Sequence, residues 1–221
     1  MRTLRPRTVL LTGFDPFGGD TVNPSWLAVE RLHDRMVAGH RIESLQLPTS
    51  FARAPRSLRT AIRRHRPSLV LCAGQAGGRP AISLERVAIN LIDARIGDND
   101  GAQPVDAPVV RGGPAAYFST LPIKAMRAEL SAAGIGADIS HTAGTFVCNQ
   151  VFYALMDTLS KMPTPRPRGG FVHVPFLPEQ VETLPGMPSM PLETIVAGLR
   201  IAIATALTTR RDRRVVGGAT H

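Results

Sequence analysis

The chain has 221 residues, of which 43% are hydrophobic and 19% charged, and its formal net charge is +9. This length fits one large α/β domain better than two domains, and the composition excludes an intrinsically disordered chain. The sequence has no run of the roughly 20 apolar residues that a membrane-spanning helix requires.

Short apolar runs that end at Gly or Pro alternate with helical segments along the chain. We expect strands at residues 9–13, 42–47, 68–73, 82–92, 137–140 and 171–174. Helices are expected at residues 26–36, 51–65, 115–133, 147–159 and 192–207, the first two with Ser25 and Ser50 as N-caps. This alternation predicts a single-domain three-layer α/β/α sandwich around a mostly parallel twisted sheet. Residues 1–6 and 210–221 are expected to be flexible tails.

One segment, residues 97–114, contains Gly, Asp, Asn, Gln and Pro with little periodicity. A loop of this length inside a compact domain is usually functional or packs on a partner subunit. In open parallel sheets the ligand crevice lies at the carboxyl ends of the strands. The glycine-rich segments 13–19 and 74–78 and His173 are predicted to lie there.

The positive charge alone favours a nucleic-acid partner, but its distribution does not. Lys occurs only at Lys124 and Lys161, so 24 of the 26 basic residues are Arg, and these are spread along the chain. The densest runs, residues 59–66 and 210–214, are not interleaved with aromatic side chains on which bases stack. We therefore expect no nucleic-acid partner, and a basic RNA-binding protein remains the non-enzyme alternative.

The two cysteines lie in different contexts. Cys72 lies within an apolar strand, where a small buried hydrophobic residue is the natural interpretation. Cys148 lies in the first turn of a predicted helix, where the free N–H groups and the helix dipole lower the pKa of a thiol. The same N–H groups can stabilise an oxyanion. A small residue that packs the first turn is the alternative for Cys148. With no disulfide framework and no secretory leader, a reducing cytoplasm is expected.

Two further polar residues lie in predicted strands. His173 alternates with Val and can point into the crevice as an acid–base group, or it can be a packing residue. Glu85 lies in an apolar strand, where an ionised carboxylate needs a partner. An imidazolium would satisfy Glu85, which would then orient the ring. Arg86 is the competing partner, although adjacent strand residues face opposite sides.

The glycine clusters match neither the dinucleotide-binding pattern nor the P-loop pattern, which disfavours a nucleotide site. Phe14 and Phe17 lie beside the first cluster and are suited to holding a flat, uncharged group. A phosphorylase-like protein that binds a nucleoside and phosphate remains the alternative enzyme, but it would not need a reactive cysteine.

Four segments together resemble the pyroglutamyl peptidase I family of cysteine peptidases. The segments are LTGFDPFGG at 11–19, ERVAIN at 85–90, AGTFVCN at 143–149 and GFVHVP at 170–175. They occur in the family's order and span nearly the whole chain. Gly97, where the family usually has Pro, and Phe146, where Tyr is frequent, depart from the pattern.

This resemblance implies a cytoplasmic cysteine exopeptidase, an omega-peptidase that hydrolyses the amide bond after an N-terminal pyroglutamyl residue through a thioacyl-enzyme. It implies Glu85, Cys148 and His173 as the catalytic set, with Arg95 near the oxyanion. The implied substrate-binding residues are Phe14, Phe17, Thr49, Gln75, Phe146 and Val147. The family works without metal or cofactor, acts on peptides with N-terminal pyroglutamate and commonly forms a homotetramer, so we expect a tetramer or a dimer.

Overall fold

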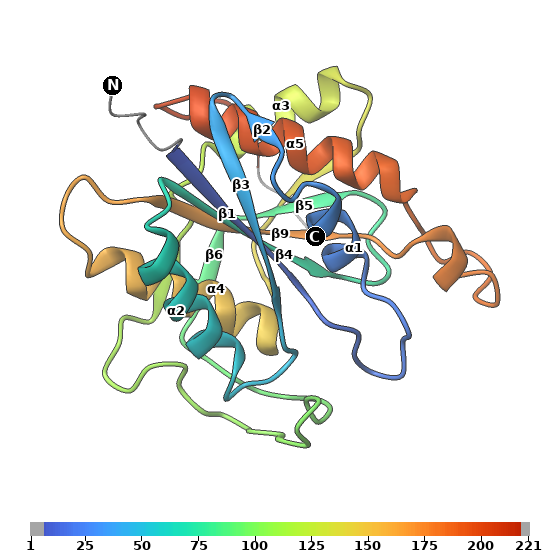
Figure 1. Cartoon of the computed structure of the whole chain (residues 1–221). Helices are drawn as coiled ribbons and strands as arrows, with labels where there is room; N and C mark the ends of the chain where they lie inside the picture. Colours follow the sequence, from blue (N-terminus) through green and yellow to red (C-terminus); the bar gives the residue numbers. More distant parts are fainter. Residues whose placement is uncertain (1–6, 218–221) are drawn as a thin grey trace.

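A seven-stranded sheet lies between two layers of helices in the computed structural model, which describes residues 7–217 (Figure 1). Its strands are β1 (Arg7–Phe14), β2 (Met36–Val37), β3 (His40–Leu47), β4 (Leu69–Gln75), β5 (Ile82–Glu85), β8 (Ala137–Ser140) and β9 (Arg168–Val174). They lie in the order β2-β3-β1-β4-β9-β5-β8. The expected tails at residues 1–6 and 218–221 lie outside the described residues.

The four central strands β3, β1, β4 and β9 run parallel to one another. β5 runs antiparallel to β9 and parallel to the edge strand β8, and the short β2 is antiparallel to β3. The prediction of a mostly parallel sheet is confirmed. Because β5 runs against β9, its last residue Glu85 pairs with Phe171, two residues before His173. The register therefore brings Glu85 and His173 to the same part of the sheet.

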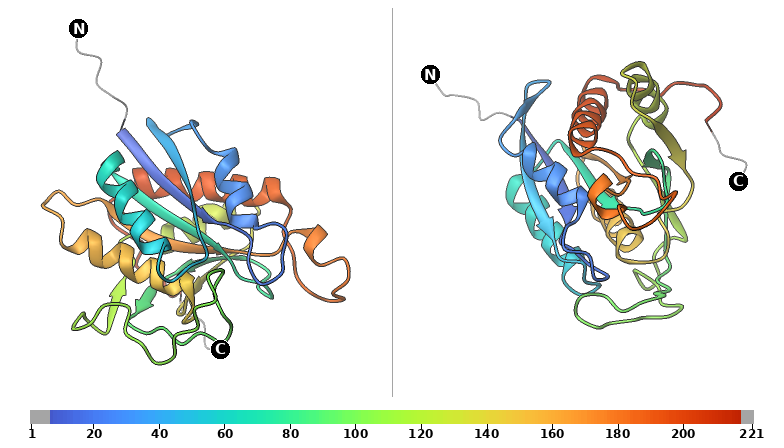
Figure 2. Two further views of the ribbon diagram at one scale, coloured as in Figure 1. Left: turned by 60° about the horizontal axis from the view of Figure 1, so that its bottom comes forward. Right: turned by 90° about the vertical axis from the view of Figure 1, so that its right-hand side faces the viewer.

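Within residues 7–217, five α-helices cover the two faces of the sheet (Figure 2). α1 (Pro24–Arg31), α3 (Ile123–Ala132) and α5 (Leu192–Thr208) lie on one face, and α2 (Ala54–His65) and α4 (Val147–Ser160) lie on the other. Alternate strand residues supply two separate cores, so Leu71 packs toward the first face and Cys72 toward the second. The predicted three-layer sandwich is confirmed. Within the described residues, each helix is too short or too polar to cross a membrane.

Two predicted elements are divided differently in the structure. The expected strand 82–92 is β5 followed by β6 (Val87–Ile89), which leaves the main sheet and pairs with β7 (Ala116–Phe118). The expected helix 115–133 therefore begins as a strand, and α3 starts only after Pro122. A proline disfavours helical geometry in the residue before it, which explains why the helix does not extend back through this position.

The N-caps of the first two helices also differ from the prediction. Asn23, rather than Ser25, caps α1, because its Oδ1 accepts a hydrogen bond from the Ser25 N–H (3.1 Å) and Pro24 occupies the first turn. α1 ends at Arg31, five residues earlier than expected. The Ser50 hydroxyl accepts a hydrogen bond from the Arg53 N–H (3.1 Å) in the turn that precedes α2.

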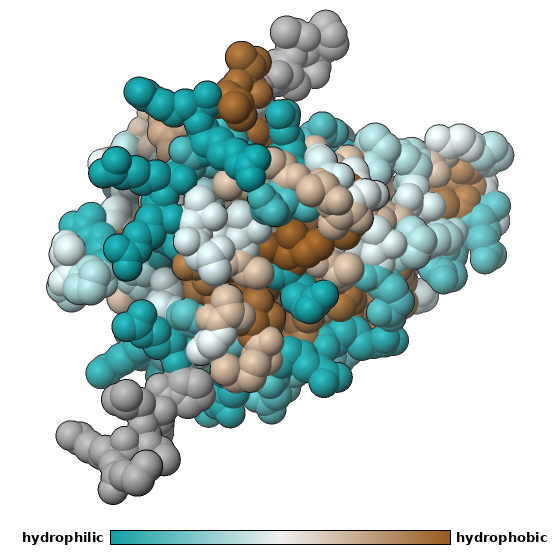
Figure 3. All heavy atoms as spheres, turned by 90° about the horizontal axis from the view of Figure 1, so that it is seen from above, coloured by the Kyte–Doolittle hydropathy of each residue, from teal (hydrophilic) through white to brown (hydrophobic). Residues whose placement is uncertain are grey.

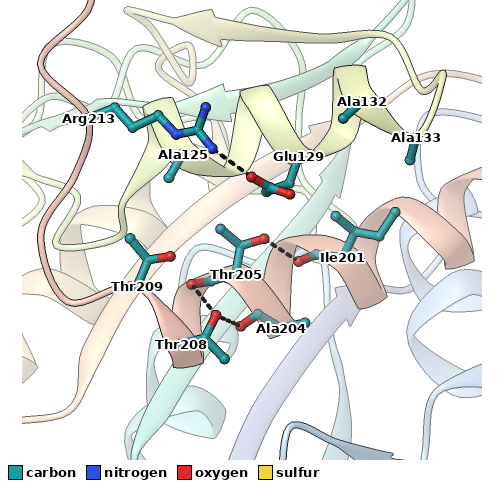
Figure 4. Close-up of a pocket in the computed structure, with 10 residues that line it drawn as sticks. All are labelled: Ala125, Glu129, Ala132, Ala133, Ile201, Ala204, Thr205, Thr208, Thr209 and Arg213. Carbon is teal, nitrogen blue, oxygen red and sulfur yellow. Dashed lines mark hydrogen bonds and ion pairs between the residues drawn. The ribbon is translucent and has the colours of Figure 1, made fainter.

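Residues 210–217, which we expected to be part of a flexible tail, lie against α3. The Asp212 carboxylate accepts hydrogen bonds from the N–H groups of Lys124 (3.1 Å) and Ala125 (2.9 Å) at the start of that helix. Arg213 pairs with Glu129 of α3 (2.7 Å) beside a groove of about 620 Å³ between α3 and α5 (Figure 4). Gly217 is buried. These contacts do not fit a free tail.

The outer side of α5 keeps several half-buried aliphatic side chains, among them Val196, Ile201 and Leu207. Figure 3 views the molecule from above relative to Figure 1 and shows hydrophobic surface gathered near the middle of this face, with hydrophilic residues around it.

Candidate active site

A cavity of about 320 Å³ opens at the carboxyl ends of β1, β4 and β9. The loop after β1, the loop after β4, the segment after β6 and the start of α4 all contribute to its walls. The lining residues are Phe17, Gln75, Ala76, Arg79, Asp93, Arg95, Ile96, Ala143, Gly144, Thr145, Phe146, Cys148 and His173. The cavity therefore lies at the edge of the sheet where the sequence predicted a crevice.

The loop after β1 is held by the cap of α1. The Ser25 hydroxyl accepts a hydrogen bond from the Phe14 N–H (3.0 Å), and Asn23 Nδ2 donates one to the Asp15 carbonyl (3.0 Å). These bonds fix the end of β1 and the start of the loop that carries Phe17. The ring of Phe17 lies 6.1 Å from the ring of Phe146, with an interplanar angle of 32°. The two rings form an aromatic wall of the cavity.

The N-terminus of α4 carries Cys148 into the same cavity. Phe146 is the N-cap residue, and its side chain makes no cap hydrogen bond; the preceding Thr145 hydroxyl donates to the Asp93 carbonyl (2.8 Å). Gly144 has a left-handed φ of 78°, which a residue with a side chain rarely adopts. The turn thus presents uncapped N–H groups beside Cys148, a suitable arrangement for binding an oxyanion.

Asn149 anchors this helix start to the segment after β6. Its Oδ1 accepts a hydrogen bond from the Ile89 N–H (3.0 Å), and its Nδ2 donates to the carbonyls of Ile89 (3.0 Å) and Leu91 (2.9 Å). All hydrogen-bonding groups of the Asn149 amide are therefore directed at one backbone segment, which fixes the position of the neighbouring Cys148.

Cys148 is half-buried, and its surroundings oppose ionisation. Burial raises the pKa of the Cys148 thiol to about 12, the negative charge of Glu85 acts in the same direction, and the positive charge of Arg79 lowers the pKa. The net direction is therefore opposite to the one expected from the helix N-terminus, because burial dominates the pKa of this thiol. A thiol in this state needs a base that removes its proton during attack.

His173 and Glu85 form a buried pair next to Cys148. His173 Nδ1 lies 2.7 Å from Glu85 Oε1, and the side chains are 5% and 0% exposed. With Nδ1 held by the carboxylate, Nε2 is the ring nitrogen left for proton transfer. No hydrogen bond joins the thiol and the imidazole within residues 7–217, although both line the cavity. Such bonds often form only when substrate binds.

Arg79 is the second partner of Glu85, and the sequence interpretation missed it. Arg79 Nη1 lies 2.7 Å from Glu85 Oε1, whereas Arg86 Nη2 donates to the Gly217 carbonyl (2.8 Å), far along the chain. Adjacent strand residues face opposite sides, so Arg86 was the less suitable candidate. The signal for Arg79 is its place just after Gly77-Gly78, at the carboxyl end of β4.

Gln75 lines the cavity as expected and belongs to a small hydrogen-bonded cluster. Its Nε2 donates to Asp20 (2.9 Å), and its Oε1 accepts from Gln180 Nε2 (3.1 Å). Gln180 lies in the short 3-10 helix η1 (Pro178–Gln180) and also accepts from the Leu177 N–H (2.9 Å). Asp20 and Gln180 thus fix the orientation of the Gln75 amide.

The structure brings seven of the ten predicted site residues into or against the cavity. Phe17, Gln75, Arg95, Phe146, Cys148 and His173 line it, and Glu85 lies directly behind His173. The other three are buried outside the lining: Phe14 packs on Phe171, the Thr49 N–H donates to Asp15, and Val147 packs in the core. Their contact with a ligand stays a prediction.

The loop at residues 97–114 is held in place rather than loose. Asp98 accepts hydrogen bonds from the N–H groups of Phe51 (2.8 Å) and Ala102 (2.8 Å), and Arg53 pairs with Asp100 (2.6 Å). A Cβ atom at Gly97 would only reach ordinary contact with Gly101, at 3.6 Å. Gly97, which departs from the family pattern, therefore leaves this loop ordered, because the residues that follow it are fixed by these bonds.

Cys72 is completely buried in β4 and packs in the core on the α2/α4 side, as predicted. Burial raises the pKa of the Cys72 thiol to about 12. Gly74, two residues further along β4, lies directly beneath Cys148: a Cβ atom there would come within 2.9 Å of the Cys148 Sγ and 2.9 Å of the Phe171 ring. Only glycine leaves room for the thiol in its present position.

Comparison with known proteins places this geometry in a family. The pyroglutamyl peptidase family matches residues 7–209 of the chain. A pyrrolidone-carboxylate peptidase of Cupriavidus necator is 56% identical over 215 residues, which cover 97% of this chain and 100% of that protein. A pyrrolidone-carboxylate peptidase of Bacillus cereus is 53% identical over the same 215 residues, with the same coverage.

Solved structures agree with the sequence comparison. Pyroglutamyl peptidase I of Bacillus amyloliquefaciens is 50% identical and superposes with a TM-score of 0.92, covering 96% of this chain and 100% of that one. Pyrrolidone carboxyl peptidase of Thermococcus litoralis is 35% identical, with a TM-score of 0.91 and coverage of 95% and 99%. The similarity in sequence and in structure extends over nearly the whole of this chain and of each protein compared with it. The chain therefore belongs to the pyroglutamyl peptidase family.

Proposed function

We propose that the chain is a cysteine omega-peptidase that removes an N-terminal pyroglutamyl residue from peptides, with Cys148 as its nucleophile. The observation that carries the proposal is the buried Glu85–His173 pair, joined at 2.7 Å, beside a cysteine at the start of a helix in one shared cavity. A nucleophile, a base and a group that orients the base are the parts that covalent acyl transfer requires.

The reaction follows from the positions of these groups. Cys148 Sγ attacks the carbonyl carbon of the pyroglutamyl residue while His173 Nε2 takes the thiol proton. The oxyanion of the tetrahedral intermediate receives hydrogen bonds from the uncapped N–H groups at the start of α4, and Arg95 lines the same cavity. The C–N bond then breaks, and the imidazolium returns its proton to the leaving amine.

The second half of the reaction uses the same base. The pyroglutamyl group remains on Cys148 as a thioester after the peptide has left. His173 accepts a proton from a water molecule, which attacks the thioester and releases pyroglutamate and the thiol. Glu85 keeps the imidazole in one tautomer through both steps and stabilises it while it is charged.

The lining of the cavity suits a small, uncharged ring. Pyroglutamate has no free α-amine, so its site needs no carboxylate that would bind an ammonium group. Phe17 and Phe146 supply a flat apolar wall, and the Gln75 amide, oriented by Asp20 and Gln180, supplies hydrogen-bonding groups for a lactam. A ligand with a polar group that finds no such hydrogen-bond partner in the cavity would bind weakly, because burying that group unpaired costs free energy.

The location and assembly of the chain are part of the same proposal. We propose a cytoplasmic enzyme that forms a homotetramer or a homodimer. Both cysteines are free thiols, which supports a reducing compartment. Light scattering on the purified chain tests the assembly, and a particle with the mass of a single chain would contradict it.

A substrate panel tests the proposed specificity. We expect the pyroglutamyl amide to be cleaved with a kcat/KM about 10⁴-fold above that of prolyl and glutaminyl amides, because both analogues carry an amine and the prolyl ring lacks the lactam carbonyl. Chromogenic amides of the three acyl groups provide the measurement. Similar kcat/KM values for prolyl and pyroglutamyl amides would contradict this account of the cavity.

The Phe17→Ala variant tests the aromatic wall in the same assay. Burial of a Phe side chain contributes about 1.5–3 kcal/mol, so its loss should raise KM for the pyroglutamyl amide roughly ten- to a hundredfold. The kcat value should change little, since no reacting group is removed. Phe118→Ala is the matched control, because Phe118 is 67% exposed on β7 and does not line the cavity.

A further inference from the structure

The Arg79 side chain connects two parts of the cavity wall. Its Nη1 lies 2.7 Å from Glu85 Oε1, and its Nη2 donates a hydrogen bond to the Thr142 carbonyl (3.0 Å). Thr142 belongs to the segment between β8 and α4, which leads to Cys148 in the first turn of α4. Arg79 lines the cavity itself, with 31% of its side chain exposed. One guanidinium thus contacts both the group that orients the base and the segment that holds the nucleophile.

The Glu85 carboxylate needs this contact. Its side chain is 0% exposed, and both of its partners, Arg79 Nη1 and His173 Nδ1, contact the same oxygen, Oε1. The other oxygen, Oε2, has no hydrogen-bond partner among the described residues. An ionised carboxylate in such a place is costly unless a cation compensates it, and a neutral imidazole supplies no charge. Arg79 is the cation in contact with it.

The charge balance at Cys148 depends on the same pair. Glu85 and Arg79 together carry no net charge, so the thiolate and the oxyanion that develop during the reaction do not face an uncompensated carboxylate. The other ionisable groups around the cavity are Asp93 and Arg95 in its wall and Cys72 in β4 behind it. Without Arg79, the negative charge of Glu85 would oppose the negative charge on sulfur and oxygen.

We propose that Arg79 is a positioning residue of this active site: it compensates the buried Glu85 carboxylate and ties Glu85 to the segment that carries Cys148. The inference rests on the proposed function for its turnover measurements, but the ionisation of Cys148 can be followed without any substrate. Arg79 acts through Glu85 and Cys148 rather than on the scissile bond.

Two substitutions at Arg79 and one control separate this role from others. Arg79→Met keeps much of the side-chain length but removes the charge and both hydrogen bonds. Arg79→Lys restores a cation that can reach Glu85 but not Thr142 at the same time. Arg86→Met is the matched control, since Arg86 follows Glu85 directly in the chain and its guanidinium contacts the Gly217 carbonyl instead of the cavity.

Turnover of a pyroglutamyl amide is the first readout. Arg79→Met should lower kcat by about 10²-fold, the usual loss when one group that stabilises developing charge is removed. KM should stay within about threefold, because Arg79 is engaged with Glu85 rather than with the substrate. Arg79→Lys should recover a large part of kcat, and Arg86→Met should resemble the unmodified protein.

The second readout is alkylation of Cys148 by iodoacetamide as a function of pH, with the modified cysteine identified by mass spectrometry. Only the thiolate reacts. Removal of the positive charge in Arg79→Met should therefore move the alkylation profile to higher pH and slow the reaction at a given pH on the order of tenfold. Arg79→Lys should lie between Arg79→Met and the unmodified protein.

Three results would overturn the inference. Arg79→Met and Arg86→Met could behave alike in turnover and alkylation. Arg79→Met could raise KM alone, which would make Arg79 a substrate-binding group. Equal losses in Arg79→Met and Arg79→Lys with an unmoved alkylation profile would show a purely structural role, and Arg79→Lys keeps this test available if Arg79→Met does not fold. If the unmodified protein cleaves no pyroglutamyl amide but the alkylation profile moves, the proposed function fails and the role of Arg79 stands.

Discussion

At the scale of single residues, the site depends on a buried carboxylate that two side chains share. Glu85 is completely buried and holds His173 at 2.7 Å, so the ring cannot rotate freely. Burial also raises the pKa of Cys148, so the nucleophilic role that we propose for this thiol requires a base. The proposed chemistry therefore depends on a correctly placed His173 ring that removes the thiol proton, rather than on a thiolate that exists before the substrate binds.

This assignment predicts unequal effects of two substitutions. His173→Ala removes the acid–base group and should lower kcat/KM by at least ~10²–10⁴-fold. Glu85→Gln should cost less, because its amide oxygen can still accept a hydrogen bond from the ring, although the charge that stabilises the imidazolium is lost. Steady-state kinetics on a pyroglutamyl amide measure both. Small, equal effects would show that both residues are structural. Glu129→Gln, on α3, is the control.

Gly74 provides a second test at this scale. Gly74→Ala would place a Cβ atom 2.9 Å from the Cys148 Sγ, so the thiol must move. A displacement of about 1 Å can cost on the order of 10² in kcat, and we expect a loss of that size with the fold retained. Gly136→Ala is the control, because a Cβ atom there meets Ala81 at an ordinary 3.5 Å. Unchanged kcat in Gly74→Ala would mean that Cys148 Sγ does not react from this position.

At the scale of secondary-structure elements, local sequence patterns predicted the layers of the fold but not every pairing between strands. The apolar strands β1, β4 and β9 and the helices α4 and α5 were predicted to within a few residues, because long periodic segments carry a strong local signal. The break between β5 and β6 was missed, since residues 82–92 continue as one β-rich run. The break exists because β6 pairs with β7, about 30 residues later in the chain, a contact that no local pattern reveals.

The same distinction applies to the site. Cys148 and His173 could be predicted because a helix start and a strand end are local features. Arg79 could not be assigned to Glu85, because that pairing depends on the loop that follows β4 and returns to the sheet as β5. Phe14 was expected to hold the ligand together with Phe17; it is the last residue of β1 and packs on Phe171, and its contact with a ligand stays a prediction. The alternation of strand side chains decides which face such a residue meets.

The segment after α5 gives an element-scale prediction. Asp212 accepts hydrogen bonds from the N–H groups of Lys124 and Ala125, and α3 has no side-chain cap from its own N-cap residue, Pro122. Asp212→Ala should therefore lower the free energy of unfolding by about 0.5–2 kcal/mol, as loss of a helix cap does, without changing kcat. Urea unfolding measures it. An unchanged midpoint, equal to that of the exposed control Asp138→Ala, would show that these bonds contribute nothing.

At the scale of the whole molecule, part of the positive charge behind the net +9 is paired with carboxylates. Five arginines are paired with carboxylates within the described residues, among them Arg31 with Glu193, Arg41 with Glu43 and Arg213 with Glu129. Exposed pairs such as Arg31–Glu193 contribute little to stability, but each neutralises positive charge locally. Salt-dependent RNA binding that survives the loss of Cys148 would favour the RNA-binding alternative.

The account as a whole depends on Cys148 as the nucleophile that attacks a pyroglutamyl amide. The most direct test is the kcat for this substrate in two variants with the same substitution, Cys148→Ala and Cys72→Ala. We expect Cys148→Ala to lose on the order of 10⁴–10⁶ in kcat with its fold intact, since the parts of such a site act as a unit. Cys72→Ala, in the core of β4, should retain nearly full activity. Turnover retained in Cys148→Ala would contradict the assignment.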